Sequence, residues 1–521
     1  MRRLLIFLLV TVFITLTFSA CNEEGAKKEQ RPAFERRPVS EEEPDFDEEE
    51  QSTFVYGEAT VVKRQLPDSK YIPGTEYDKI GTLKGGADKE AIAMRDKILS
   101  AEDELEISGK KYYFSSKGND DNDGKTPQTP KKNLDAIGTL LLEPGDAILL
   151  ERGSVFRISS SIRLRSEGTM FGAYGTGPKP EIWGSVENYA RIEKWEPYKA
   201  KNVWQMDLSL ADAGMVIFNH GEAIGKKKFS SAEIEGNFDY YHDMEEAKLY
   251  LYYDKGNPGK VFEDIEIGTN FSAVGLGADN LTVNNICFKY IGAHGIAGNR
   301  INNIKITDCE FGWIGGSLSG PKVRYGNAVQ FGEGGGTNLI VDDNWVYQIY
   351  DAGLTFQDYE TEVNDTTWEN ISFSNNLIEY CTMPLEWWNS KEKLNNIIKG
   401  IIFKGNIMRF SGFGWGVQRP DDFNAGISCS GGKDYPNLSD FIVEDNIFDC
   451  GKLIISWTFN TIEPGWEVRN NSFYQRPYKE NRYFNIGAPG NNDGYAKNAA
   501  EFEALIKRLF DSTPKEIKWM E

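Results

Sequence analysis

The sequence contains few of the residues that bind transition metals or build disulfide frameworks. Only three of the 521 residues are His, and six are Cys. The five cysteines after Cys21 form no C-x-x-C pair and are odd in number, so neither a zinc site nor a disulfide framework is indicated. They fall inside apolar phrases and are expected to be small core residues. Catalysis by a Ser or Cys nucleophile has little support, because no arrangement of His and acid accompanies such a residue.

Positive charge is also scarce. The formal net charge is −21, and the run from Glu41 to Glu50 alone supplies eight acidic charges. Binding to nucleic acid, or to an anionic membrane surface through charge attraction, is therefore not expected.

A long apolar run occurs at the N-terminus, where Arg2 and Arg3 precede residues 4–18 and the segment ends in Ser-Ala-Cys21. A Cys directly after small residues resembles the bacterial lipobox, which implies cleavage before Cys21 and lipidation of its thiol. The alternative is a plain transmembrane anchor. Under the lipoprotein interpretation, residues 1–20 are the signal peptide, and the charged residues 21–52 form a disordered acidic tether. We expect an extracytoplasmic protein, lipid-anchored to a bacterial membrane and exposed at the cell surface.

Long helical periodicities are rare, whereas Gly is abundant (52 residues) and aromatic residues make up 13% of the chain. This composition favours β structure with many turns. From residue 280 a phrase recurs that consists of a short apolar strand, a polar turn and another short strand. Five residues after the first apolar position of successive phrases stand Ile286, Cys309, Asn344, Asn376, Asn406, Asn446 and Asn471. This predicts a ladder of stacked Asn side chains in a solenoid whose loops vary in length.

The rest of the chain divides around this solenoid. Residues 53–108 are an N-terminal extension with a helix over 88–103, and residues 109–490 form the solenoid. A β-rich insert interrupts it at about 190–265. Residues 491–521 are expected to cap the open end with an amphipathic helix, N-capped by Asn498, and a final strand.

Several phrases resemble known proteins. YYFSSKGNDDNDGKTPQTP, PGDAILLERG and FGAYGTGPKPEI resemble the opening of secreted right-handed parallel β-helix proteins that act on polysaccharides, among them glycoside hydrolase families 120 and 141 and several polysaccharide lyases. WIGGS, RYGNAVQF and YDAGLTFQ resemble a bacterial group of right-handed β-helix repeat proteins. The resemblance covers roughly residues 110–490. It implies an all-β, pectate-lyase-like right-handed parallel β-helix and a carbohydrate-active enzyme.

One set of phrases carries the candidate site. When the phrases are aligned on their central apolar residue, one column contains Ile296, Val329, Leu354, Leu385 and Ile427. Neighbouring side chains of a strand point to opposite faces, so the residues that follow this core column form a solvent-facing stripe. The stripe consists of Ala297, Gln330, Thr355, Glu386 and Ser428.

Two carboxylates are the predicted catalytic residues. Asp351 and Glu386 belong to neighbouring coils and could lie roughly 5–9 Å apart, the range used by glycosidase pairs. Because alternate residues of a strand face opposite sides, Trp387 is expected in the core, and Trp388 is expected on the outer face as a platform for a sugar ring. The predicted substrate-binding residues are Arg324, Asn327, Gln330, Thr355, Gln357 and Trp388.

Other interpretations stay open. Asp351 could simply cap a turn, and Glu386 could be an ordinary surface residue. Three residues after each ladder position, Glu379, Arg409 and Asp449 form an alternating row that we interpret as surface ion pairs.

The function also has alternatives. Cleavage of a polysaccharide or oligosaccharide by a glycoside hydrolase, without a cofactor, is the first. A polysaccharide lyase would use Lys322, Arg324 or Arg419 as a base, often with Ca²⁺, whereas His294, near the stripe, is interpreted as a structural residue. The third possibility is a surface protein that binds glycans without turnover. The oligomeric state is left open.

Overall fold

The computed structural model describes residues 84–103, 105–358, 366–389, 395–419, 426–430, 438–451, 453–457, 466–475, 485–486, 498–510, 512 and 514–519. The predicted signal peptide, Cys21 and the acidic tether lie outside these residues. Within them, no helix is both long and apolar enough to cross a membrane.

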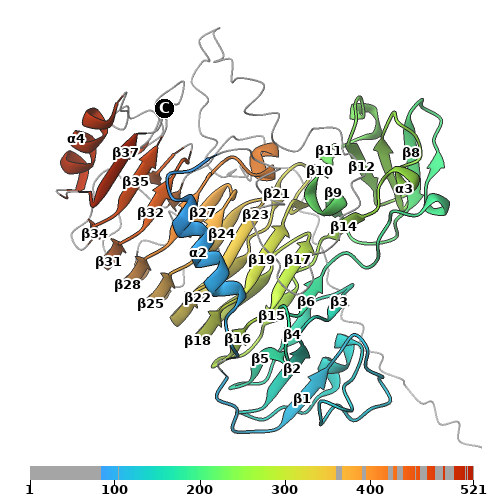
Figure 1. Cartoon of the computed structure of the whole chain (residues 1–521), viewed down its shortest axis with the longest axis horizontal. Coiled ribbons are helices and arrows are strands. Elements are labelled where there is room, and N and C mark those ends of the chain that lie inside the picture. The colour runs from blue at the N-terminus through green and yellow to red at the C-terminus, as the bar shows by residue number, and fades with distance from the viewer. Residues whose placement is uncertain are drawn as a thin grey trace, which may run out of the picture.

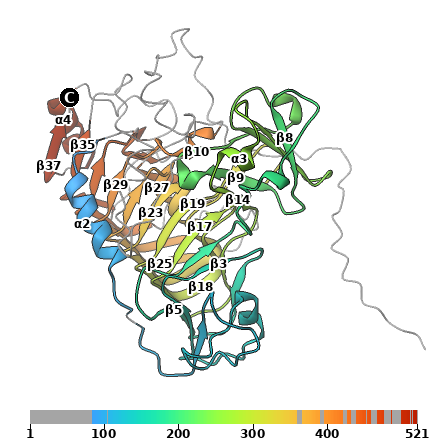
Figure 2. The same cartoon turned by 45° about the vertical axis from the view of Figure 1, so that its right-hand side comes forward.

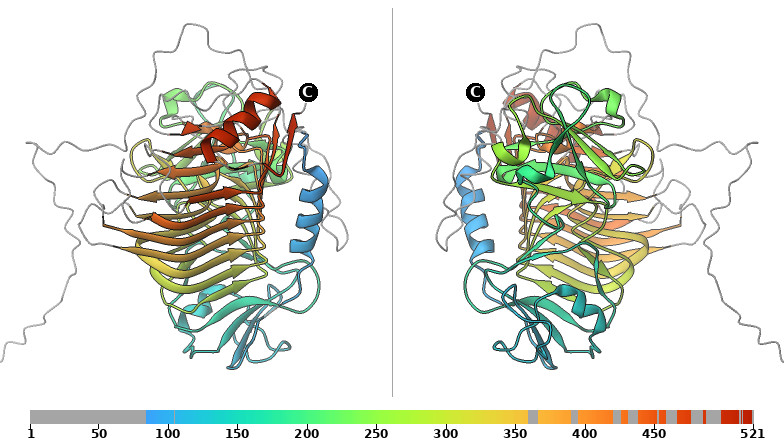
Figure 3. Two further views of the ribbon diagram at one scale, coloured as in Figure 1. Left: turned by 90° about the vertical axis from the view of Figure 1, so that its left-hand side faces the viewer. Right: turned by 90° about the vertical axis from the view of Figure 1, so that its right-hand side faces the viewer.

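The chain winds into a parallel β-helix, as predicted, and each coil contributes a strand to up to three faces (Figures 1 and 3). All strand pairs within these faces are parallel. The first face contains β4 (Ile162–Leu164), β15 (Val274–Leu276), the beginnings of β18 (Ile296–Thr307) and β22 (Val329–Asp342), β24 (Ala352–Asp358), β27 (Met383–Asn389), β30 (Ile427–Ser430), β33 (Ile455–Trp457) and β36 (Asn485–Ile486).

The other two faces complete each coil. The second face contains β1 (Lys111–Phe114), β2 (Ala147–Glu151), β5 (Met170–Tyr174), β16 (Thr282–Asn284), the ends of β18 and β22, β25 (Thr367–Ser374), β28 (Ile397–Lys404), β31 (Leu438–Glu444) and β34 (Trp466–Arg469). The third face contains β3 (Val155–Arg157), β6 (Glu181–Trp183), β17 (Cys287–Ile291), β19 (Glu310–Ile314), β23 (Trp345–Ile349), β26 (Leu377–Glu379), β29 (Ile407–Arg409), β32 (Ile447–Asp449), β35 (Ser472–Gln475) and β37 (Glu516–Trp519).

Apolar side chains fill the inside of the coils. The predicted core column is confirmed, since each of its members is paired in register with the next and is fully buried. Aromatic side chains stack in the same way, and the rings of Phe373 and Phe403 are almost parallel at 5.4 Å. Four of the cysteines are free and buried, namely Cys287, Cys309, Cys381 and Cys450.

The Asn ladder is confirmed at the corner between the second and third faces. The Oδ1 atom of Asn376 accepts hydrogen bonds from the backbone N–H of Asn344 (3.0 Å) and from its side-chain amide (3.1 Å). Asn406, Asn446 and Asn471 repeat this pattern. The residue before each ladder position has positive φ and is Asn, Asp or Gly, as at Asp343 (φ 57°), because these types tolerate that conformation best.

A second Asn ladder lies on the outside of the second face. The side-chain amides of Asn303, Asn338 and Asn370 each donate to the preceding Asn, at 2.8–3.1 Å, beginning at Asn280. Each of these residues also has positive φ. This second ladder could have been predicted from the sequence, because the four repeated phrases that begin at these positions all start with Asn.

The ion-pair row on the third face is buried, so its interpretation as a surface row is wrong. Glu379, Arg409 and Asp449 are in register on β26, β29 and β32 and expose 2%, 4% and 1% of their surface. Helix α2 (Asp88–Leu99) covers them along the side of the stack (Figure 3). Arg95 of α2 donates to Glu379 at 2.8 Å. Burial alone would raise the pKa of Glu379, but Arg95 and Arg409 outweigh it and lower the pKa.

The insert forms two small sheets with their own apolar core (Figure 2). It packs against β17 and against the hairpin of β20 (Ser317–Leu318) and β21 (Arg324–Tyr325). Its strands are β7 (Glu196–Pro197), β8 (Val203–Asp207), β9 (Ala213–Phe218), β10 (Ala223–Ile224), β11 (Lys226–Lys227), β12 (Asp239–Asp243), β13 (Lys248–Tyr252) and β14 (Ile265–Thr269). Its helical turns are η2 (Ile192–Lys194), η3 (Asn219–Gly221), η4 (Ser231–Glu233) and α3 (Pro258–Val261).

A helix and a strand complete the C-terminal end. Asn498 precedes α4 (Ala499–Phe510) and accepts a hydrogen bond from the backbone N–H of Glu501 at 3.0 Å, which is the predicted N-cap. Phe502 is fully buried, and its ring packs edge-on against Phe473 at 5.5 Å. Strand β37 pairs with β35 and extends the third face.

Candidate functional site

The stripe on the first face has the predicted register. Gln330 pairs with Thr355, Thr355 with Glu386, and Glu386 with Ser428. The same row extends backwards through Ala297 and Gly275 to Arg163 on β4.

Most of the stripe is buried, so the prediction that it faces solvent is wrong for its central residues. The exposed fractions of Gln330, Thr355 and Glu386 are 5%, 0% and 8%. Part of the reason is that Thr355 stands between two longer side chains on adjacent strands. Gly275 and Ala297 are partly exposed, and Arg163 is exposed. The row is therefore open at β4 and closed around Thr355.

Glu386 is the acidic side chain at the centre of the closed part. Its Oε2 atom accepts hydrogen bonds from the Thr355 hydroxyl (3.2 Å) and from the Gln357 side-chain amide. Trp388, one step along β27 on the same face, is partly exposed, whereas Trp387 is fully buried in the core, as parity predicted. The carboxylate thus has two side-chain donors and an indole beside it.

Asp351 does not join Glu386. Its carboxylate forms a buried ion pair with Arg419, which is itself 8% exposed. Since Thr355 pairs with Glu386, Asp351 is displaced by four residues, or about 13 Å along an extended strand. Glu386 is bonded to Gln357, on the far side of Thr355 from Asp351. The predicted pair of carboxylates 5–9 Å apart is therefore not supported by this geometry.

Arg324 is turned away from the stripe. Its guanidinium donates to the carbonyl oxygens of Gly316 (2.7 Å) and Gly214 (3.0 Å) and to Oε1 of Gln418 (3.1 Å). It also lies 4.4 Å above the ring of Tyr350. Because Gly214 belongs to the insert, Arg324 holds the insert against the β-helix.

Asn327 and Gln330 belong to a network that runs toward the insert. The Asn327 side chain donates to Gln330 and accepts from the backbone N–H of Ala352 at 2.8 Å. The backbone N–H of Asn327 donates to Nδ1 of His294 at 3.1 Å. Burial lowers the pKa of His294 to about 4, so its ring is neutral and carries its proton on Nε2. His294 therefore accepts the hydrogen bond of the Asn327 backbone through Nδ1 and holds this backbone in place rather than acting as a base.

The network continues past His294. The ring of Tyr325 meets His294 edge-on at 5.1 Å, and its hydroxyl donates to Oδ1 of Asn270 at 2.7 Å. The sequence interpretation missed this connection, and it also missed Arg163. The signal for Arg163 was the alternation in SIRLRS, which places Ile162 in the core column next to Val274.

A metal site is not apparent in this region. Among the described residues, no group of three or more His, Cys, Asp or Glu side chains could hold a metal ion. The donor set of the stripe therefore does not fit the carboxylate-rich sites that Ca²⁺ prefers.

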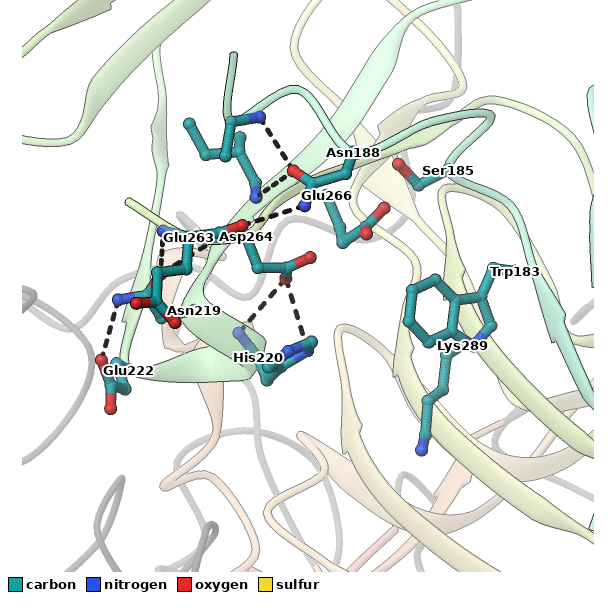
Figure 4. Close-up of polar contacts among 12 residues, drawn as sticks. Trp183, Ser185, Asn188, Asn219, His220, Glu222, Glu263, Asp264, Glu266 and Lys289 are labelled. Carbon is teal, nitrogen blue, oxygen red and sulfur yellow. Dashed lines mark hydrogen bonds and ion pairs between the residues drawn. The ribbon is translucent and has the colours of Figure 1, made fainter. Parts of the chain in front are cut away.

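A second cluster of ionisable residues lies where the insert meets the first coils (Figure 4). Glu266 is fully buried and forms two hydrogen bonds with Arg157 of β3, at 2.6 and 2.7 Å. Asp264 lies 3.4 Å from Nδ1 of His220. Because Glu266 is inaccessible and paired, we interpret this cluster as a structural junction rather than a glycan site.

No protein-family model and no curated protein matches the chain. Similar solved structures include a complex of XylC with xylose, at 12% identity and a TM-score of 0.45, where the match covers 72% of this chain and 66% of the other. A protein described as a glycoside hydrolase is 10% identical, with a TM-score of 0.38 and 79% and 96% covered. A rhamnogalacturonan lyase is 12% identical, with a TM-score of 0.31 and 72% and 73% covered. At these identities the similarities do not extend to activity, which has to be argued from the side chains.

Proposed function

We propose that the protein is a carbohydrate-active enzyme, a glycoside hydrolase with Glu386 at its centre. The supporting observation is that two side chains of β24 on the preceding coil, Thr355 and Gln357, donate to the Glu386 carboxylate, which stands beside a partly exposed indole. Hydrogen bonds to a carboxylate favour its ionised form, which suits a general base or a nucleophile. Trp388 offers a face on which a sugar ring could stack.

Asp351 has a supporting role in this proposal. A hydrolase needs a second group that supplies a proton, and Asp351 is a poor choice because its buried carboxylate is already committed to the ion pair with Arg419. We therefore assign Asp351 to the positioning of Arg419, whose guanidinium could in turn contact a substrate hydroxyl or carboxylate.

The burial of the site bears on the mode of action. Glu386 exposes only 8% of its surface, and Thr355 beside it exposes none. An uninterrupted polymer has little room to lie across such a residue. We propose that the substrate is a chain end or a short oligosaccharide.

The experiment compares Glu386→Gln with wild-type protein on a panel of plant and algal oligosaccharides, with reducing ends as the readout. Loss of the base or nucleophile should lower the rate by about 10²–10⁴-fold. The matched control is Glu369→Gln, which removes a carboxylate from β25 on the second face and should leave the rate unchanged. Turnover by Glu386→Gln within twofold of wild type would refute the assignment.

A lyase is the second candidate, favoured by the Asp351–Arg419 pair, because β-elimination does not require a second free carboxylate. A lyase would give an unsaturated product that absorbs ultraviolet light, whereas a hydrolase would not. Binding without any product on the whole panel would instead indicate a non-catalytic glycan-binding protein.

We also propose that Cys21 carries a lipid that anchors the protein to a bacterial membrane. The support is the apolar segment that ends in Ser-Ala-Cys. Replacing Cys21 with Ser should move the protein from the membrane fraction to the soluble extracytoplasmic fraction. Continued membrane association would favour a transmembrane anchor.

A further inference from the structure

Two arginines project from the open end of the first face. Arg163 lies on strand β4, and Arg165 is the first residue after the end of this strand. The two arginines alternate along the chain with the buried Ile162 and Leu164. Both side chains are exposed, and neither has an ion pair or hydrogen bond within the part of the chain that the structure describes. Exposed arginines without partners retain all their donors for a ligand.

Each arginine borders a cavity. A cavity of about 410 Å³ lies beside Arg163 and is lined by Ser159, Ser161, Asn270 and the partly exposed ring of Phe271. None of its lining residues is acidic, in a chain whose net charge is −21. A second cavity of about 260 Å³ is lined by both arginines and by the helical turn η1 (Leu134–Thr139), whose Asp135 is the one acidic residue of the lining. Hydroxyls, an amide, an aromatic face and unpaired guanidinium groups are the groups that recognise an acidic sugar.

The floor between these cavities and the proposed catalytic region carries no large side chain. Gly275 and Ala297 separate Arg163 from Gln330 in the same row. A Cβ atom added at Gly275 would lie 3.7 Å from Nη1 of Arg163, so the guanidinium group extends over this glycine. At about 4.8 Å per strand, Arg163 is about 14 Å from Gln330 and about 24 Å from Glu386 along the axis. A short oligosaccharide could span this distance.

We propose that Arg163 and Arg165 form a subsite for the anionic group of an acidic glycan, either a uronate carboxylate or a sulfate ester. The inference rests on the proposed function and specifies its substrate class. The glycan lies along the axis of the β-helix over the open part of the row, with its charged unit at β4 and its other end directed toward Glu386. The planar fork of arginine matches both carboxylate and sulfate oxygens, and the ring of Phe271 supports the sugar.

The experiment measures dissociation constants with the Glu386→Gln protein, so that turnover does not interfere. The probes are oligogalacturonides, sulfated galactan oligosaccharides and neutral galactan oligosaccharides of equal length, and the first two separate the carboxylate from the sulfate. Adding Arg163→Gln and Arg165→Gln together should lower the affinity for at least one anionic probe relative to the neutral probe by at least tenfold. Adding Arg469→Gln, an exposed arginine on β34, is the matched control and should leave that ratio unchanged.

Two results would overturn the subsite. One is an unchanged ratio in the double arginine variant, and the other is equal affinity of the starting protein for anionic and neutral probes. A failure of the proposed function would be recognised by a different result. The Glu386→Gln protein would then retain turnover, regardless of how the arginine substitutions change the affinity.

Discussion

Single side chains on the first face hold one another in fixed positions. Asn327 links Gln330, the backbone of β24 and His294, while Thr355 and Gln357 hold Glu386. Such networks are costly to build but reduce the reorganisation needed when a substrate binds. The neutral state of His294 is part of this arrangement, because protonated Nδ1 could not accept the Asn327 N–H.

The low pKa of His294 has a consequence for stability. Between about pH 4 and pH 6.5 the unfolded chain binds a proton at this residue and the folded protein does not, so the contribution to stability is present above pH 6.5 and is lost as the pH falls toward 4. We expect His294→Leu to lower the free energy of unfolding by about 2 kcal/mol at pH 7, since the Asn327 N–H loses its acceptor. Urea unfolding at pH 7 and pH 5 should show this difference shrinking with acidity.

Nuclear magnetic resonance supplies an independent check, because the chain has only three histidines. The His294 ring should remain neutral down to about pH 4. A normal histidine titration at this position, or a stability difference that does not change with pH, would contradict the interpretation.

At the scale of structural elements, the two Asn ladders contribute differently. Asn376 is fully buried, and its side chain bonds the next ladder residue, the backbone N–H of Asn344 and the carbonyl oxygen of Val341. Asn376→Ala leaves buried backbone groups unpaired and should lower the free energy of unfolding by about 3 kcal/mol. Asn370→Gly removes a bond of the exposed ladder without straining the positive φ of this residue (58°) and should cost only about 0.5–1 kcal/mol. Urea unfolding of both variants gives the comparison, and equal losses would show that burial does not decide the contribution.

Local patterns predicted the elements that depend on neighbouring coils in the same register. The core column from Ile296 to Ile427, the ladder through Asn376 and the cap at Asn498 follow from alternation and hydrogen-bonding capacity. The core column and the ladder recur once per coil, so a single alignment of the phrases revealed them, whereas the cap was predicted from the residue type before the helix. The sequence also placed Glu386 correctly beside Thr355.

The predictions that failed depend on contacts between distant segments. The row of Glu379, Arg409 and Asp449 looked exposed because no pattern indicates that α2, almost 300 residues earlier, covers it. Asp351 was matched to Glu386 by counting residues, whereas its actual partner is Arg419, 68 residues away. Arg324 likewise contacts Gly214 of the insert. Burial of this kind is set by tertiary packing, which strand periodicity does not encode.

At the scale of the whole molecule, the insert and the first coils together shape the open end of the first face. The 410 Å³ cavity is bordered by Ser159 and Arg163 of the coils on one side and by Ala211 of the insert on the other. The position of the insert therefore affects access to the proposed anion subsite. Its junction with the coils is the buried cluster around Glu266, whose carboxylate bonds Arg157 of β3. Glu266, Asp264 and His220 of this cluster are seen in Figure 4.

This junction should weaken as the pH rises. Burial raises the pKa of Asp264, and burial together with the neighbouring Asp264 raises the pKa of Glu266 to about 8, although Arg157 partly offsets the effect at both residues. Between about pH 4.5 and pH 8 the folded protein therefore holds one proton that the unfolded chain has released, and stability falls with rising pH by up to about 1.4 kcal/mol per pH unit. Asp264→Asn leaves Glu266 alone with Arg157 and should flatten this dependence, whereas Asp254→Asn, at an exposed site of the insert, should keep it. The free energy of unfolding, measured with urea from pH 5 to pH 8.5, tests this prediction. If it depends on pH in the same way for Asp264→Asn and wild type, the pair of Asp264 and Glu266 does not retain the proton.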